Sequence, residues 1–289
     1  MRGPLPNAFL VGMPKAGTTA LAAALAAHPD CRVSHPKEPG FFARDLPRRR
    51  IDTWTAYRAL WEGAQEAVRL DASTTYLRSL EAVPAIEAVY PGARYVAVLR
   101  EPAAVVEAMH AELLRSGIEH HRDLGRAWRR AGGSPWCDYR AWGAVGSQVA
   151  RLLATVPGER VLLLRYEHWR ERPRETLDAV QQFLGLAPRV LPVPRANPRA
   201  YPRWLWLARA AEKLRPWAWR TANVLGCHAA VDGAAWLLQR LERRQRPVWP
   251  ATLRQAIREH FVEEVRLLER LTGWDLAAWR EPLPRQEAT

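Results

Sequence analysis

Residues 7–21 have the composition of an anion-binding loop. They read N-A-F-L-V-G-M-P-K-A-G-T-T-A-L, which predicts a buried strand, a tight loop and the first turn of an alanine-rich helix. Free backbone N–H groups converge at the start of a helix, and the helix dipole adds partial positive charge there. Gly12 and Gly17 let the backbone approach a ligand closely. Because Lys15 adds a mobile cation and the threonines at 18–19 add hydroxyl donors, the segment has the chemistry of a phosphate site.

The order of these residues differs from that of a Walker A loop. In the pattern G-x-x-x-x-G-K-[ST], the lysine directly follows the second glycine. Here Lys15 follows Pro14 and precedes Gly17 by two residues. The alternative to a phosphate site is a strand–helix corner that carries an incidental lysine.

Two further predicted strands end in polar side chains. Residues 94–99 form the clearest strand, and Arg100 follows it with a guanidinium suited to a bidentate grip on phosphate. Residues 68–71 predict another strand, which Ser73 and Thr74 follow. Side chains at the ends of strands in open parallel sheets point into the ligand crevice. The alternative for the two hydroxyls is a turn that caps the next helix.

The segment H-P-K-E-P-G-F-F at residues 35–42 places three ionisable side chains next to one another. Its two prolines leave the loop little conformational freedom. A surface turn in which Lys37 and Glu38 simply face water is the alternative to a functional loop.

The strings P-K-x-G-T-T, K-E-P-x-F-F and R-E-P occur in this order and resemble the motifs of sulfotransferases that use 3′-phosphoadenosine 5′-phosphosulfate (PAPS). The resemblance extends along the chain to Gly185. It implies that Arg100 binds the 3′-phosphate and that Glu38 is the general base for the acceptor. Lys15 would also be catalytic, because it offsets charge on the bridging oxygen. The loop residues that would bind the 5′-phosphosulfate are Pro14, Lys15, Ala16, Gly17, Thr18 and Thr19.

The same resemblance implies contacts further along the chain. The residues expected on the acceptor side are Lys37, Ser73, Thr74 and His110. His110 alone also fits a core or capping histidine. Arg199 and Tyr201 lie in a basic, proline-rich stretch, which in this family commonly closes over the nucleotide; an ordinary linker is the alternative. A serine normally lies eight residues after the arginine of the 3′-phosphate motif, and Ala108 stands there in this chain.

Composition limits the class of protein. A chain of 289 residues with 48% hydrophobic and 25% charged residues can bury one large core. No apolar run reaches the roughly 18 residues needed to span a bilayer, and we see no signal peptide. The three cysteines are odd in number and lack the spacing of metal ligands, so they predict buried small side chains, which fits the reducing conditions of a cytoplasmic protein, and we expect no metal.

The net charge of +13 favours anionic partners. The 43 basic residues include three lysines, at positions 15, 37 and 213, and two of these lie in the N-terminal motifs. A compact ammonium suits a point charge on a transferring group better than a planar guanidinium does. The arginines mostly predict a solvated face and no nucleic-acid motif appears, so nucleic acid is not an expected partner.

The predicted strands alternate with helices, and they lie at residues 8–12, 32–34, 68–71, 94–99 and 160–166. This pattern predicts an α/β fold, a P-loop-like three-layer arrangement with a mainly parallel central sheet flanked by helices. We expect the core with the PAPS site at 1–190. Residues 191–289 would add a basic loop, a Trp/Arg-rich helical annex and a closing helix at 251–272. The annex at 203–249 fits a cap, an acceptor-binding lid or a segment that contacts an anionic membrane peripherally.

We therefore expect a sulfotransferase that moves the sulfuryl group from PAPS to an acceptor hydroxyl, or to an amine, and releases 3′,5′-ADP. The acceptor would belong to a carbohydrate or a small natural product. A nucleotide kinase is one alternative, which would share the fold but need Mg²⁺ and ATP. A basic, non-enzymatic protein that binds membrane or nucleic acid is the other, and its binding would depend steeply on salt.

Overall fold

The computed structural model describes residues 5–47, 49–130, 135–193 and 249–281. The chain divides into two compact units, which are described separately. The first unit consists of residues 1–105, 141–196 and 258–281, and the second of residues 106–140, 197–257 and 282–289.

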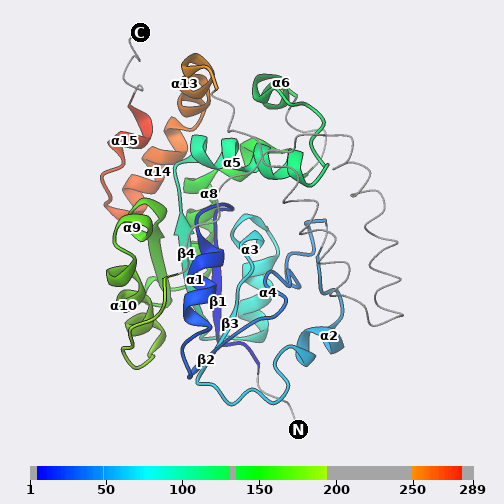
Figure 1. Cartoon of the computed structure of the whole chain (residues 1–289), viewed down its shortest axis with the longest axis vertical. Coiled ribbons are helices and arrows are strands. Elements are labelled where there is room, and N and C mark those ends of the chain that lie inside the picture. Colours follow the sequence, from blue (N-terminus) through cyan, green and yellow to red (C-terminus); the bar gives the residue numbers. More distant parts are fainter. Residues whose placement is uncertain (1–4, 48, 131–134, 194–248, 282–289) are drawn as a thin grey trace. The chain divides into compact units, whose positions relative to one another are not determined.

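A five-stranded sheet forms the centre of the first unit (Figure 1). Its strands are β1 (Ala8–Gly12), β2 (Cys31–Val33), β3 (Val68–Asp71), β4 (Arg94–Leu99) and β5 (Val161–Arg165). The strand order is β2-β3-β1-β4-β5, and every neighbouring pair is parallel. The chain first moves from β1 toward one edge and later to β4 on the other side of β1. Ligands of such sheets bind where the direction reverses, beside β1.

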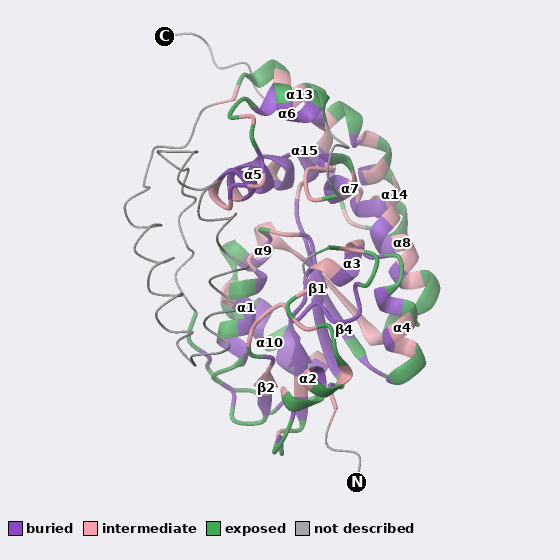
Figure 2. Ribbon diagram, turned by 90° about the vertical axis from the view of Figure 1, so that its right-hand side faces the viewer, coloured by how far each residue is buried: buried purple, intermediate pink, exposed green. Residues whose placement is uncertain are grey.

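Helices cover both faces of this sheet, which confirms the predicted three-layer α/β fold. The helices are α1 (Thr18–Leu25), α2 (Trp54–Ala59), α3 (Thr75–Arg78), α4 (Ala82–Val89), α8 (Val145–Thr155), α9 (Tyr166–Glu171), α10 (Pro173–Leu184), α14 (Val262–Thr272) and α15 (Ala277–Arg280). Figure 2 shows α1 and α10 on one side of the sheet and α3, α4 and α8 on the other. A short 3₁₀ turn, Gly158–Arg160, leads into β5.

Proline and glycine set the ends of two helices. Pro173 begins α10, where its missing N–H costs no hydrogen bond. Gly185 ends the helix with a φ of 74°, a left-handed conformation that glycine adopts without strain. Gly273 ends α14 in the same way, with a φ of 70°.

Two predicted helices are each divided in the structure. The helical spacing of the apolar residues at 138–153 predicts a single helix, but the structure has α7 (Tyr139–Gly143) and α8 there, and the closing helix predicted at 251–272 becomes α13 (Ala251–His260) and α14. The two breaks meet, because a Cβ atom at Gly143 would overlap the ring of Phe261. The buried Phe261 ring therefore occupies the space that a side chain at position 143 would need.

An aromatic cluster joins the sheet to the loop that follows β2. Phe9 stacks on Tyr95 with ring centroids 5.5 Å apart, and Phe41 stacks on Tyr57 at 4.6 Å. Phe42 meets Phe9 edge to face at 6.3 Å. All five rings are buried, so the K-E-P-x-F-F segment is anchored by its two phenylalanines.

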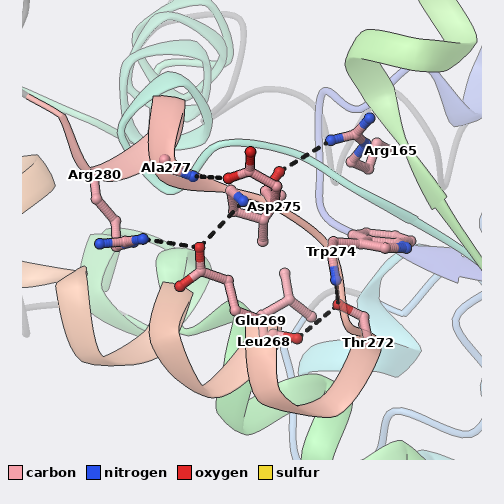
Figure 3. Close-up of polar contacts among 9 residues, drawn as sticks. Arg165, Leu268, Glu269, Thr272, Trp274, Asp275, Ala277 and Arg280 are labelled. Carbon is pink, nitrogen blue, oxygen red and sulfur yellow. Dashed lines mark hydrogen bonds and ion pairs between the residues drawn. The ribbon is translucent and has the colours of Figure 1, made fainter.

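The last helices are fastened to each other and to the end of β5 (Figure 3). The Glu269 carboxylate accepts hydrogen bonds from Leu276 N at 3.1 Å and from Arg280 Nη2 at 3.0 Å. Arg165 Nη1 donates to the Asp275 carbonyl at 3.3 Å. Leu276 and Trp279 are buried. These contacts link α14 and α15 to the carboxyl end of β5, the outer strand of the sheet.

The second unit contains most of α5 (Pro102–Arg115), α6 (Leu124–Arg129) and most of α13. Its described part contains polar contacts to two buried glutamates. Arg254 Nε lies 2.5 Å from Glu107 Oε1, and Tyr139 donates its hydroxyl to Glu119 at 2.8 Å. Among the described helices of either unit, none has both the length and the apolar character needed to cross a bilayer.

The contact between α8 and α14 gives a test of this packing. A Cβ atom at Gly146 would overlap the Glu264 carbonyl and lie 2.9 Å from the Leu267 side chain. We expect Gly146→Ala to lower the free energy of unfolding by about 1–3 kcal/mol, the usual scale of overpacking. Gly158→Ala is the matched control, because no described atom lies within 4 Å of the new methyl group. Denaturant unfolding of both variants checks this, and equal losses would contradict the packing.

Candidate active site

Three adjacent strands carry the predicted site residues at their carboxyl ends. The phosphate loop follows β1, Arg100 follows β4, and Ser73 and Thr74 follow β3. Since β1 pairs with both β3 and β4, these segments lie at one edge of the sheet. The structure therefore places these segments next to one another.

The phosphate loop is held against β4 by its backbone. Met13 N donates to the Val98 carbonyl at 2.9 Å, and a Cβ atom at Gly12 would overlap the Val98 backbone. Gly17 takes a left-handed conformation at the start of α1, with a φ of 81°. Glycine is therefore required at both ends of this turn, which leaves the helix N-terminus and its N–H groups next to the loop.

The Arg100 side chain contacts the backbone of the phosphate loop. The side chain is 7% exposed, and its Nη1 donates to the Lys15 carbonyl at 2.5 Å. Its backbone N–H points to Met13 Sδ at 3.4 Å. The guanidinium thus links the end of β4 to the backbone of Lys15, the residue whose side chain is the cation of the loop.

Helix α9 supplies contacts that the sequence analysis missed. The Arg100 guanidinium lies 4.3 Å from the centre of the Tyr166 ring, a cation–π contact. A Cβ atom at Gly17 would come within 2.8 Å of Trp169 Nε1, so the indole packs directly against the loop. Burial raises the pKa of the neighbouring Glu167, while the charge of Arg100 lowers it. The only signal in the sequence was the position of Y-E-H-W after a predicted strand.

The Glu38 side chain is held from two sides. Lys37 Nζ lies 3.0 Å from Oε1, and the Thr74 hydroxyl donates to Oε2 at 2.8 Å. Glu38 N also donates to the Ala72 carbonyl at 2.9 Å. The side chain of Glu38 is 38% exposed, so its carboxylate remains open to solvent and to a substrate. The structure therefore brings together Lys37, Glu38 and Thr74.

Lys15 and Glu38 share an unusual backbone conformation. Among the described residues, they are the non-glycine residues with a positive φ, at 61° and 60°. A left-handed conformation costs a non-glycine residue on the order of 1–3 kcal/mol and persists only where the surroundings enforce it. The two residues predicted to be catalytic are thus the described non-glycine residues with a left-handed backbone.

A buried carboxylate lies beneath the Glu38 loop. Asp71, the last residue of β3, is wholly buried. It accepts hydrogen bonds from Ser73 Oγ at 2.7 Å, from Tyr57 Oη at 2.7 Å and from Tyr76 Oη at 2.9 Å. Burial raises the pKa of Asp71 to about 6; the three hydroxyls lower it and the charge of Glu38 raises it. Ser73 is also wholly buried, and its hydroxyl donates its hydrogen bond to the Asp71 carboxylate.

The other predicted site residues have varied positions. In the loop, Ala16 and Thr18 are buried, Pro14 is half-buried, and Lys15 and Thr19 are exposed. His110 belongs to the second unit, where it is wholly buried with Nε2 2.8 Å from the His121 carbonyl. Burial lowers its pKa. Ala108 is buried in the same unit, and Arg199 and Tyr201 lie outside the described residues.

Within the described ranges, no group of three or more His, Cys, Asp and Glu side chains is placed to hold a metal ion.

Comparisons with known proteins give consistent matches. The model of a family described as "Sulfotransferase family" matches residues 6–75 and 69–189. The chain is 24% identical over 205 residues to the bifunctional heparan sulfate N-deacetylase/N-sulfotransferase 3 of Mus musculus, covering 64% of this chain and 23% of that protein. It is 29% identical over 187 residues to the heparan sulfate glucosamine 3-O-sulfotransferase 6 of Homo sapiens, covering 63% and 52%. The match thus spans about a quarter and about half of the length of these two curated relatives.

A solved structure has the same fold. A sulfotransferase from Alicyclobacillus acidocaldarius superposes with a TM-score of 0.73 at 22% sequence identity, covering 96% of this chain and all of that one.

The buried Asp71 makes a prediction about stability and pH. Its pKa is about 6 in the folded protein and 3.8 for an ordinary aspartate, so between these values the folded state holds the proton more tightly. The contribution of this group to stability is therefore complete below about pH 4 and is lost as the pH rises through 6. Since asparagine does not ionise, we expect the unfolding free energy of Asp71→Asn, relative to the wild type, to rise across this window. Urea unfolding at several pH values measures the difference, and a difference independent of pH would contradict the assignment.

Proposed function

The chain belongs to the sulfotransferase family, and on this premise we propose that it transfers the sulfuryl group of PAPS to an acceptor hydroxyl or amine. The family membership disfavours the two alternatives, a nucleotide kinase and a basic non-enzymatic protein. The acceptor in this proposal belongs to a carbohydrate or a small natural product. The names of the matched relatives refer to heparan sulfate, which supports a carbohydrate.

One observation carries the proposal. Lys15 and Glu38 hold strained backbones in the loops that follow β1 and β2, and the Glu38 carboxylate contacts Thr74 in the turn after β3, the strand next to β1. Strain of this kind gathers at active sites, where the surrounding structure enforces it. A cation and a carboxylate in such positions match the needs of a transfer in which a negative leaving group departs and an acceptor loses a proton.

The nucleotide would bind at the phosphate loop. The N–H groups of the loop and the hydroxyls of Thr18 and Thr19 would hold the 5′-phosphate, at the end of α1 where the dipole is positive. Arg100 would hold the 3′-phosphate, since its guanidinium lies next to the loop and its Nη1 bonds the Lys15 carbonyl. In this proposal Ala108 supplies no hydroxyl to that phosphate.

The transfer itself would proceed in line. The acceptor oxygen or nitrogen attacks sulfur, and the bond between sulfur and the bridging oxygen of PAPS breaks. The acceptor's proton passes to Glu38, and the electron pair leaves with 3′,5′-ADP. Lys15 offsets the charge that develops on the bridging oxygen, which is the electrostatic part of the catalysis.

The acceptor would approach from the side of the K-E-P-x-F-F loop. Lys37 and Thr74 both contact the Glu38 carboxylate, so they fix its direction and line this side of the site. Ser73 is expected on the same side, with its buried hydroxyl bonded to Asp71. Four further expectations stay predictions. These are the acceptor contact of His110, the nucleotide contacts of Arg199 and Tyr201, the membrane contact of the annex, and the cytoplasmic location.

The roles of Lys15 and Glu38 predict large losses of rate. We expect Glu38→Gln and Lys15→Ala each to lower kcat by at least ~100-fold, the scale of a lost acid–base or electrostatic contribution. Glutamine has the shape of glutamate but cannot act as the base. Glu62→Gln, an exposed glutamate after α2, is the matched control and should keep the wild-type rate. Sulfate transfer from PAPS to a panel of sugars measures these rates, and full activity of Glu38→Gln would remove Glu38 from the mechanism.

The nucleotide site predicts selective stabilisation by 3′,5′-ADP. A ligand at 100 times its dissociation constant stabilises the folded state by about 2.7 kcal/mol, which a melting curve resolves. We expect this shift with 3′,5′-ADP but not with 5′-AMP or with ATP plus Mg²⁺.

Substitution of Arg100 by lysine distinguishes specific phosphate binding by the guanidinium from a general effect of positive charge. Arg100→Lys should lose most of the shift, because an ammonium cannot grip a phosphate in the bidentate way. Arg174→Lys, on the exposed face of α10, should keep it. A shift with ATP and Mg²⁺ alone would favour a kinase instead.

A further inference from the structure

Asp71 is the end point of a set of hydroxyl hydrogen bonds that the proposed chemistry does not use. Its Oδ1 accepts from Ser73, and its Oδ2 accepts from both Tyr57 and Tyr76, at 2.7 to 2.9 Å. An ionised carboxylate has only acceptor sites. Each of the three hydroxyls therefore directs its single proton toward Asp71.

Two of these hydroxyls also receive N–H groups from the Glu38 loop. Gly40 N donates to Ser73 Oγ at 3.1 Å, and Phe42 N donates to Tyr76 Oη at 3.4 Å. Because the hydroxyl protons point at Asp71, the oxygen lone pairs are left for these amides. Asp71 thus fixes the orientation of the Ser73 and Tyr76 hydroxyls, and these hydroxyls in turn accept hydrogen bonds from the loop backbone.

These hydrogen bonds reach the loop just beyond its strained residue. Glu38 has a φ of 60°, and its own N–H is bonded to the Ala72 carbonyl, next to Asp71 in the chain. Gly40 and Phe42 follow within four residues. The loop is therefore held to the end of β3 both at Glu38 and immediately after it.

We propose that Asp71 is a positioning residue, which fixes the Glu38 loop by orienting the hydroxyls of Ser73 and Tyr76. The inference rests on the proposed role of Glu38 as the general base. Asp71 itself is wholly buried and contacts no reacting group. We call Asp71, Ser73 and Tyr76 the loop tether.

The choice of a carboxylate supports this role. Burial of a charge disfavours folding, so an apolar or amide group at this place would be expected if stability alone mattered. An asparagine would present an N–H₂ group on one side, and one of the hydroxyls facing it would have to turn its proton away. Its partner amide in the loop would then face that proton instead of a lone pair.

Two tyrosines provide a matched comparison. Tyr57 and Tyr76 both donate to Asp71 Oδ2 and both are buried, but of the two only the Tyr76 hydroxyl receives a described N–H of the Glu38 loop. We expect Tyr76→Phe to lower kcat by on the order of 10-fold, because small misplacements of a catalytic group are costly. Tyr57→Phe should stay within about threefold of the wild type at a similar loss of stability. Equal effects on kcat would overturn the proposal.

The direct test combines Asp71→Asn with Glu38→Gln. Asp71→Asn should lower kcat by on the order of 10- to 100-fold while the KM for PAPS changes less than about twofold. If Asp71 acts through Glu38, Asp71→Asn should cause no further loss in the Glu38→Gln background. An additive loss in the double variant would show that Asp71 acts independently of the base, and would overturn the proposal.

A measurement without substrate separates this inference from the proposed function. In Asp71→Asn and Tyr76→Phe, the amide hydrogens of the loop at 38–42 should exchange with solvent faster than in the wild type. The amide of Met13, in the phosphate loop, should keep its rate, which also shows that the variants are folded. Unchanged exchange at 38–42 would overturn the tether. If the wild type transfers no sulfate from PAPS, the proposed function fails, and this exchange result still decides whether Asp71 holds the loop.

Discussion

The parallel pairing of β1 with its two neighbours is the constraint on which the whole site depends. β3 and β4 flank β1 in register, so the three segments that follow them emerge at one edge. The approach of β1 to β4 is so close that position 12 has no room for a side chain against Val98. This pairing sets the phosphate loop beside Arg100. It equally sets the loop beside the turn after β3 that contacts Glu38.

Packing outside the site provides the free energy that offsets the unfavourable conformations within it. Two left-handed residues and one buried carboxylate all disfavour the folded state. The aromatic cluster around Phe41 and Phe42 anchors the Glu38 loop, and the stack of Tyr166 on Arg100 steadies the other side. A well-packed core therefore carries a locally unfavourable backbone, and it holds the cation and the carboxylate in fixed directions before a substrate arrives.

The sequence predicted most of the fold because the relevant signals are local. All five strands were placed within about a residue, and β1, β4 and β5 contain the continuous apolar runs that are typical of buried parallel strands. Proline and glycine gave the ends of α10. The breaks at Gly143 and Phe261 escaped prediction, because each helix keeps its apolar period across the break and only the meeting of the two segments reveals it. For the same reason Asp71, Tyr166 and Trp169 were missed: their partners are distant in the chain, at Tyr57, Arg100 and Gly17.

The strained backbones at positions 15 and 38 also bear on how this chain would evolve. Glycine at either place would relieve the left-handed conformation, by about 1 kcal/mol or more. Selection for thermal robustness alone would therefore favour glycine at both, while selection for turnover opposes it. A lineage in which catalysis is no longer selected would accumulate these two substitutions and become well folded but inactive. The residues at positions 15 and 38 would then distinguish active members from inactive ones.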